Sequence, residues 1–260
     1  MQIYNLYNEH EMEYPIIINI PHSGTIIPEE IKEKFIKPEP TISNNDWFLK
    51  ELYDFLIDEK LTILSANYSR YVVDLNRVIT NPIIGQDYNK YTIYSKTIWN
   101  KKLYNEIPSI EECKKRIETY YNPYHDKLRE LITEKLNRFN KILIIDLHSG
   151  LSSTGEKDIC LGNAKNEMSE IKTIELLKQN LEKVGYTVGL NKPMTGGKVL
   201  RKYHKENNNI ECILFELNFN VYIRDGFIGD EEVKEYNREK FSKAKENLKK
   251  AFNTYLKEYK

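Results

Sequence analysis

Histidine and carboxylate side chains follow several apolar runs of this chain, at the points where those runs end. His22 follows the run YPIIINIP, His148 ends the run KILIIDLH, and Glu216 ends the run ECILFE. Imidazole and carboxylate groups can transfer protons or bind a metal ion. In an open α/β sheet, ligands bind outside the carboxyl ends of the strands. We therefore expect these three residues to converge at one edge of a sheet.

A fourth apolar run, RYVVDLNR (70–77), ends in Asn76 and Arg77. The planar guanidinium of an arginine can bind a carboxylate through two parallel hydrogen bonds. Arg77 is therefore a candidate for binding an acidic substrate at the same edge. The alternative is a structural salt bridge from Arg77 to Asp74 or Asp87.

Three residues have both a structural and a functional interpretation: Asp46, His22 and His125. Asn44 or Asn45 could cap a helix with Asp46 in its first turn, where a carboxylate complements the helix dipole. Asp46 could equally be a carboxylate ligand that faces the sheet edge. His22 could be an incidental loop residue, and His125 could be a histidine packed between helices.

The elements that would position these residues alternate between strands and amphipathic helices. Apolar β-branched runs predict strands and 3.6-residue periodicity predicts helices. Segment 80–100 has neither pattern and is interpreted as a long excursion near the site. The expected strands are 14–20, 61–66, 70–76, 142–147, 158–161, 186–193 and 211–220, and residues 1–14 are expected to form a short strand or arm. The expected helices are a short one that begins at Pro28-Glu29, one that begins at residues 44–46 and reaches 56, and three longer ones over 109–139, 167–184 and 231–260. The helix over 109–139 is expected to be broken or kinked at Asn122-Pro123. A loop is expected over 36–45.

Length and composition limit the possible classes of protein. The 260 residues are 40% hydrophobic and 30% charged, enough for one large α/β domain over 1–260. A net charge of zero argues against nucleic acid or an anionic membrane as a partner. No apolar run approaches the length of a membrane span, and residues 1–14 do not resemble a signal peptide. Three scattered cysteines fit a reducing cytoplasm.

Eight short motifs together resemble one family. The chain is similar to N-formylglutamate amidohydrolases, within the zinc-dependent carboxypeptidase and aspartoacylase-like group. The resemblance covers most of the chain from about 15 to 225, in the family's order. The motifs are PHSG (21–24), NNDWF (44–48), YVVDLNR (71–77), NPYH (122–125), IDLHSG (145–150), DICLG (158–162), KPMTGGKVLRKY (192–203) and FELNFNVY (215–222).

The resemblance implies a fold and a reaction. The implied fold is a three-layer α/β/α sandwich around a mixed, mostly parallel sheet, as in zinc exopeptidases. The implied reaction is hydrolysis of the N-acyl bond of a small acyl-amino acid such as N-formylglutamate, with one zinc ion per chain. His22 and His148 would bind the zinc, and Glu216 would be the catalytic base. Asn76 and Arg77 would hold a substrate carboxylate.

One position departs from the wider group, in which the first metal histidine is followed three residues later by a glutamate ligand. Position 25 is threonine here, so the third ligand must come from elsewhere. Asp46 is the preferred candidate, and Glu29 or His125 is the fallback.

Further roles and alternatives follow from the same resemblance. Arg201 is expected to hold a second substrate carboxylate, Asn218 is placed with the substrate-binding residues, and Asp146 or Asp74 is expected to orient a metal ligand. The enzyme would act as a monomer or small homo-oligomer. Two other functions stay open: a deacylase or peptidase acting on another acyl-amino acid or short peptide, and a non-catalytic homologue that binds a small molecule.

Overall fold

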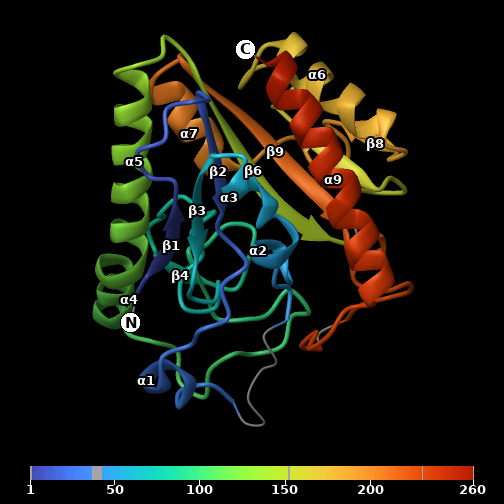
Figure 1. Ribbon diagram of the computed structural model, residues 1–260. Coiled ribbons are helices and arrows are strands. Elements are labelled where there is room, and N and C mark those ends of the chain that lie inside the picture. Colours follow the sequence, from blue (N-terminus) through green and yellow to red (C-terminus); the bar gives the residue numbers. More distant parts are fainter. Residues whose placement is uncertain (1, 37–42, 152, 230, 260) are drawn as a thin grey trace.

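The structure is a computed structural model that describes residues 2–36, 43–151, 153–229 and 231–259 (Figure 1). The loop expected over 36–45 therefore lies largely outside the described residues. Among the described helices, none is long and apolar enough to cross a bilayer.

A seven-stranded mixed sheet runs through the described part of the chain, in the order β1-β3-β2-β6-β9-β7-β8. The four strands β3, β2, β6 and β9 are parallel, β1 is antiparallel to β3, and β7 is antiparallel to β9. Two-residue strands β4 (Ile84–Gly85) and β5 (Ile93–Tyr94) form a separate pair within the 80–100 excursion. The strands of the main sheet are β1 (Tyr4–Tyr7), β2 (Ile16–Ile20), β3 (Thr62–Ala66), β6 (Ile142–Gly150), β7 (Ile159–Gly162), β8 (Val188–Leu190) and β9 (Ile210–Asn218).

Helices cover both faces of this sheet. Figure 1 shows α4 and α5 on one side of it and α6 with α9 on the other. This arrangement confirms the α/β fold with a mixed central sheet and flanking helices. The described helices are α1 (Glu29–Lys32), α2 (Leu49–Leu52), α3 (Phe55–Asp58), α4 (Ile110–Arg116), the π-helix η1 (Ile117–Tyr121), α5 (Asn122–Leu136), α6 (Ile171–Lys183), α7 (Lys198–Glu206), α8 (Phe219–Tyr222) and α9 (Arg238–Glu258).

Strand alternation divides the buried side chains into two apolar layers. Ile144 and Leu214 belong to the layer that packs on α5 and α7, whereas Ile145 and Ile213 belong to the layer that contains α9. Because side chains alternate along a strand, Asp146, His148 and Glu216 project on the same face as Ile144 and Leu214.

The register of the parallel strands aligns the polar residues at their carboxyl ends. His148 pairs directly with Glu216 across β6 and β9, and Asn19 pairs with Asp146 across β2 and β6. The sequence-based expectation that these strand ends converge at one edge is therefore confirmed for β2, β6 and β9.

The prediction of a strand over 70–76 is wrong. This segment is a series of turns, in which Asp74 Oδ1 accepts a hydrogen bond from the Asn76 amide at 2.7 Å. Such a local side-chain bond competes with a sheet ladder. In addition, β3 is already paired on both edges, by β1 and β2, so it offers no edge to the segment that follows it.

The predicted helix from Asn44 or Asn45 is also wrong at its start. Phe48 has a left-handed backbone, with φ 57°, which separates Asp46 from the short helix α2. Asp46 instead lies in a segment without regular secondary structure, and its backbone amide donates to the His22 carbonyl at 3.1 Å.

The irregularity predicted at Asn122-Pro123 is present as a change of helix type. The π-helix η1 joins α4 to α5 without a gap, and α5 begins at Asn122, directly before the proline, which lacks an amide hydrogen. One other helix boundary differs from prediction. The last helix begins at Arg238 rather than at 231, with the Asn237 side chain as its cap.

Candidate active site

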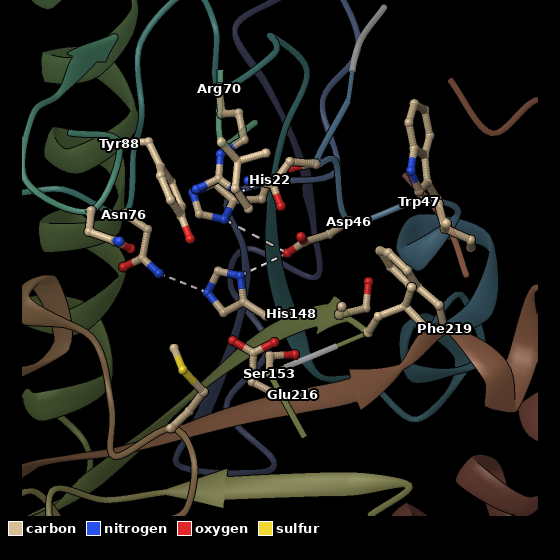
Figure 2. A pocket seen from close by; sticks show the side chains of 18 of the residues that line it. His22, Asp46, Trp47, Arg70, Asn76, Tyr88, His148, Ser153, Glu216 and Phe219 are labelled. Atoms are coloured by element: carbon tan, nitrogen blue, oxygen red, sulfur yellow. Dashed lines mark hydrogen bonds and ion pairs between the residues drawn. The ribbon is translucent and has the colours of Figure 1, made fainter. Parts of the chain in front are cut away.

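A cavity of about 750 Å³ lies at the carboxyl edge of the sheet. Its lining includes His22, Asp46, His148 and Glu216, which approach one another in Figure 2. Two of these residues come from β6 and β9, and two come from the loops that follow β2 and precede α2. All four side chains are buried, at 3 to 6% exposure. They therefore form a polar centre that bulk water does not reach freely.

Each of the two histidines is held through its Nε2 atom by a buried carboxylate. His22 Nε2 lies 2.8 Å from Asp74 Oδ1, and His148 Nε2 lies 2.9 Å from Asp146 Oδ2. A carboxylate behind a histidine fixes the ring and its tautomer, which is typical of metal-binding histidines. The expectation that Asp74 or Asp146 orients a ligand therefore agrees with the geometry of both residues.

The two Nδ1 atoms face the carboxylate of Asp46. Asp46 Oδ2 lies 2.8 Å from His148 Nδ1 and 3.8 Å from His22 Nδ1. One ligand atom from each of the three residues lies within 4.8 Å of the others. Because the three atoms converge, these residues could hold a single metal ion.

The protonation of the histidines supports this interpretation. Burial, together with the nearby Arg70 guanidinium, lowers the pKa of His22 to about 4, so its ring is neutral at pH 7. A neutral ring that donates from Nε2 to Asp74 presents a lone pair at Nδ1 toward Asp46. Burial alone would lower the pKa of His148, but Asp146 and Asp46 raise it well above its usual value. A cation between His22, His148 and Asp46 would replace that proton.

The balance of buried charge also fits a divalent cation. Four carboxyl groups lie at this edge: Asp46, Asp74, Asp146 and Glu216. In the part of the chain that the structure describes, two guanidinium groups lie among them, those of Arg70 and Arg77. Buried charges are costly unless they are compensated. Two imidazoles and one carboxylate are a ligand set typical of catalytic zinc, which keeps a fourth position open.

Glu216 lies beside this triad without being part of it. Burial, with Asp46 and Asp146 nearby, raises the pKa of Glu216 to about 7, whereas His148 and the Ser153 hydroxyl lower it. Ser153 and Glu216 are adjacent in Figure 2. A carboxyl group with a pKa near 7 can both accept and donate a proton at neutral pH.

Asn76 and Arg77 line one side of the cavity. The Asn76 amide lies 2.9 Å from His148 Nε2, and Arg77 Nε donates to the Tyr88 carbonyl at 2.8 Å. The ion pair from Arg77 to Asp74 is long, at 3.9 Å, so the alternative of a purely structural salt bridge is weakly supported. The excursion 80–100 contributes Tyr88, Asn89, Ile98 and Trp99 to the lining, as expected of a segment near the site.

Four residues named from the sequence lie outside this cavity. Arg201 pairs with Glu167 at 2.6 Å, and it lies one turn further along α7 than Lys198, outside the cavity lining. Asn218 caps α8 and donates to Thr154 Oγ1, so it positions a loop. Of the fallback ligands, Glu29 is exposed in α1. Both ring nitrogens of His125 are bonded, to the Tyr203 hydroxyl and the Leu75 carbonyl.

Sequence reasoning missed two cations of the cavity. Arg70 Nη2 donates to Asp74 Oδ2 at 2.8 Å, while its buried Nε has no hydrogen-bond partner among the described residues. Lys198 begins α7 after Gly196-Gly197, and it too lines the cavity. Lys198 stands within the motif KPMTGGKVLRKY (192–203), which was the available signal, whereas Arg70 directly precedes the motif YVVDLNR (71–77) and had no signal of its own.

Comparison with known proteins identifies the family. The model of the N-formylglutamate amidohydrolase family matches residues 14–223. The chain belongs to this family. Two proteins named N-formylglutamate deformylase, from Pseudomonas putida and Pseudomonas aeruginosa, are each 28% identical to it. The alignment with the P. putida protein covers 83% of this chain and 84% of that protein. The alignment with the P. aeruginosa protein covers 78% of this chain and 80% of that protein.

Solved structures support the fold of this N-formylglutamate amidohydrolase family member. An N-formylglutamate amidohydrolase from Ralstonia eutropha JMP134 superposes with a TM-score of 0.84 at 21% identity, covering 99% of this chain and 98% of that one. A gene product of Agrobacterium tumefaciens superposes with a TM-score of 0.75 at 15% identity, covering 100% and 96%.

We expect His22→Ala and His148→Ala to lower zinc content well below that of the parent protein, because each change removes one of three convergent ligands. Zinc per chain is measured by mass spectrometry after dialysis. His10→Ala is the matched control, since His10 is an exposed histidine that pairs with Glu134 far from the cavity. Full zinc occupancy in either site variant would contradict the assignment.

Proposed function

We propose that this protein is a zinc-dependent hydrolase that removes the formyl group from N-formylglutamate, giving formate and glutamate. Family membership and the names of the Pseudomonas relatives support this substrate. The observation that carries the proposal is the convergence of His22, His148 and Asp46 beside Glu216, inside a cavity that also holds Arg77.

We assign one zinc ion per chain to His22, His148 and Asp46. Zinc supplies two things when it is bound: it lowers the pKa of a water molecule to about 7, and it polarises the carbonyl of the scissile amide. The protein contributes orientation, because Asp74 and Asp146 hold both rings with their Nδ1 atoms directed at Asp46.

Glu216 moves the proton. Its carboxylate accepts a proton from the attacking water, whose oxygen forms the new bond to the formyl carbon. When the carbon–nitrogen bond breaks, the same carboxyl group gives the proton to the leaving amine nitrogen. The register that pairs Glu216 with His148 keeps this carboxylate beside the zinc ligands.

Arg77 and Asn76 are proposed to bind the α-carboxylate of the amino acid. The Arg77 side chain is held by the Tyr88 and Asn76 carbonyls, so its orientation is fixed before substrate arrives. A preorganised guanidinium loses less freedom on binding a carboxylate than a mobile lysine would. This is the role that the family resemblance implied for both residues, which is to hold a substrate carboxylate.

Lys198 is better placed than Arg201 to bind the side-chain carboxylate of glutamate. Its ammonium lines the cavity, and among the described residues no carboxylate pairs with it. The first turn of a helix disfavours a cation, and α7 has no acidic residue there to offset the cost. An unpaired cation at an unfavourable position is explained by a ligand carboxylate that it binds.

The test of this function is release of formate from N-formylglutamate by the zinc-loaded protein, alongside the acetyl and succinyl derivatives of several amino acids. We expect turnover of N-formylglutamate, its loss after chelation and its return when zinc is added. Full zinc loading without turnover of this substrate would contradict the proposal, and turnover of another acyl-amino acid would identify the alternative deacylase.

For Glu216→Gln we expect kcat to fall by roughly 10² to 10⁴, because the amide keeps the shape but accepts no proton. Zinc content should stay at the parent level, since Glu216 is not one of the three ligands. In the parent, kcat/KM should fall as the pH drops through about 7, where burial places the pKa of Glu216 and its protonated form cannot act as a base. Near-parental turnover in the variant would rule this role out.

For Arg77→Lys we expect kcat/KM on N-formyl-amino acids to fall by about 10- to 150-fold, since a charge-assisted hydrogen bond contributes roughly 1.5–3 kcal/mol. The α-amide of the same substrate has no α-carboxylate to bind, and its hydrolysis should change little. Equal losses on the acid and the amide would indicate that Arg77 supports the fold through Asp74 instead.

For Lys198→Gln we expect kcat/KM on N-formylglutamate to fall by about two- to fivefold, as for an exposed charge pair. Hydrolysis of N-formylalanine, which has no side-chain carboxylate, should be unchanged. Lys202→Gln is the matched control, because Lys202 lies on the same helix but outside the cavity. A similar loss on both substrates, or in the control, would contradict the role of Lys198.

A further inference from the structure

The cavity has more room and more apolar surface than a formyl group needs. Its volume of about 750 Å³ is in the range that encloses drug-sized ligands, about 300–1,000 Å³. A formyl group has no alkyl or aryl surface to bury. The proposed substrate therefore leaves part of the lining unexplained. A role for that part in binding the acyl group rests on the proposed function.

The polar and apolar parts of the lining lie on opposite sides of the catalytic centre. In Figure 2, Asn76 and Tyr88 lie on one side of His148, and Trp47 and Phe219 lie on the other. Arg77 belongs to the first side, since it bonds to the Tyr88 and Asn76 carbonyls. For an amino acid bound by Arg77 with its amide at Glu216, the second side is the part of the lining opposite the amino acid, where an acyl group could lie.

The apolar side of the cavity is a wall of two buried aromatic side chains. Trp47 and Phe219 are 4% and 7% exposed and belong to the apolar layer that contains α9. The Tyr222 hydroxyl lies 2.9 Å from the Trp47 carbonyl oxygen and 2.8 Å from Ser149 Oγ. These contacts connect the wall to the end of β6, one residue beyond His148.

Two exposed aromatic rings also line the cavity. Trp99 is 42% exposed and Phe227 is 72% exposed, and both line the cavity. They come from segments far apart in sequence, yet their rings meet edge to face with centroids 5.8 Å apart. Two exposed aromatic rings that meet inside a cavity lining are available to pack against an apolar ligand.

We propose that Trp47, Phe219, Trp99 and Phe227 form an acyl subsite, and that the protein also hydrolyses amino acids whose N-acyl group is a medium-length alkyl or an arylalkyl chain. Water adds to the acyl carbon, the carbon–nitrogen bond breaks, and the products are a carboxylic acid and the free amino acid. Glu216 transfers the proton from water to the amine nitrogen as in deformylation, so no further reactant is needed.

The experiment compares kcat/KM of the zinc-loaded enzyme on four glutamate derivatives: N-formyl, N-acetyl, N-hexanoyl and N-phenylacetyl. The acetyl group has a single methyl group to bury, whereas the hexanoyl and phenylacetyl groups would bury much more apolar surface against the wall. We expect kcat/KM for the hexanoyl and phenylacetyl compounds to exceed that for the acetyl compound by at least tenfold.

Substitutions of the two exposed aromatic residues test whether this preference depends on the apolar lining. Phe227→Ala and Trp99→Ala should each lower the ratio of kcat/KM for the phenylacetyl compound to that for the formyl compound by about tenfold. Both residues are exposed, so neither change removes buried packing of the core. Ile171→Ala is the matched control, because Ile171 is 59% exposed on α6 and outside the cavity lining, and its ratio should stay at the parent value.

The outcomes separate this inference from the proposed function. Hydrolysis of the formyl compound with no preference for the longer chains over acetyl would overturn the acyl subsite alone. Hydrolysis of the phenylacetyl compound without that of the formyl compound would support the subsite and overturn the proposed substrate. No hydrolysis of any of the four at full zinc loading would overturn both.

Discussion

The pairing of each buried histidine with a buried carboxylate is the constraint on which the rest of the site depends. Asp74 holds His22 and Asp146 holds His148, so both Nδ1 atoms face Asp46. Burying several carboxylates at one sheet edge is unfavourable unless cations and hydrogen bonds compensate them. The segment 70–77 supplies that compensation, since Arg70 and Arg77 hold the pKa of Asp74 well below its usual range against the effect of burial.

The same network extends into the helical layer. The Tyr124 hydroxyl on α5 donates to Asn19 Oδ1, and the Asn19 amide donates to Asp146 Oδ1, both at 2.6 Å. A helix, two neighbouring strands and His148 are thereby connected by satisfied polar contacts. Fully satisfied networks of this kind are rigid, which keeps a catalytic group in position before substrate binds. The polar centre therefore depends on the helix packing behind it.

The cavity combines this rigid centre with two chemically different sides. The side containing Arg77 and Asn76 offers charge and hydrogen bonds, and the side containing Trp47 and Phe219 offers apolar surface (Figure 2). An acyl-amino acid has the same division on either side of its amide. Strand register fixes the centre, whereas loops between distant elements build both sides, which is where substrate preference can vary while the chemistry stays the same.

The sequence by itself determined the sheet core and the residues at its carboxyl edge, because buried parallel strands are continuous apolar runs whose polar ends share one edge. His22, His148 and Glu216 could be chosen on that basis. Tertiary structure decided the rest, since those contacts join segments with no local pattern. It brought Asp46 to the histidines from a non-helical segment, folded 70–76 into turns because β3 had no free edge, and placed Lys198 in the cavity with Arg201 outside it. Lys198 and Arg201 are three residues apart and share one face of α7, so helical periodicity does not distinguish them, and only the position of the first turn of α7 at the cavity does.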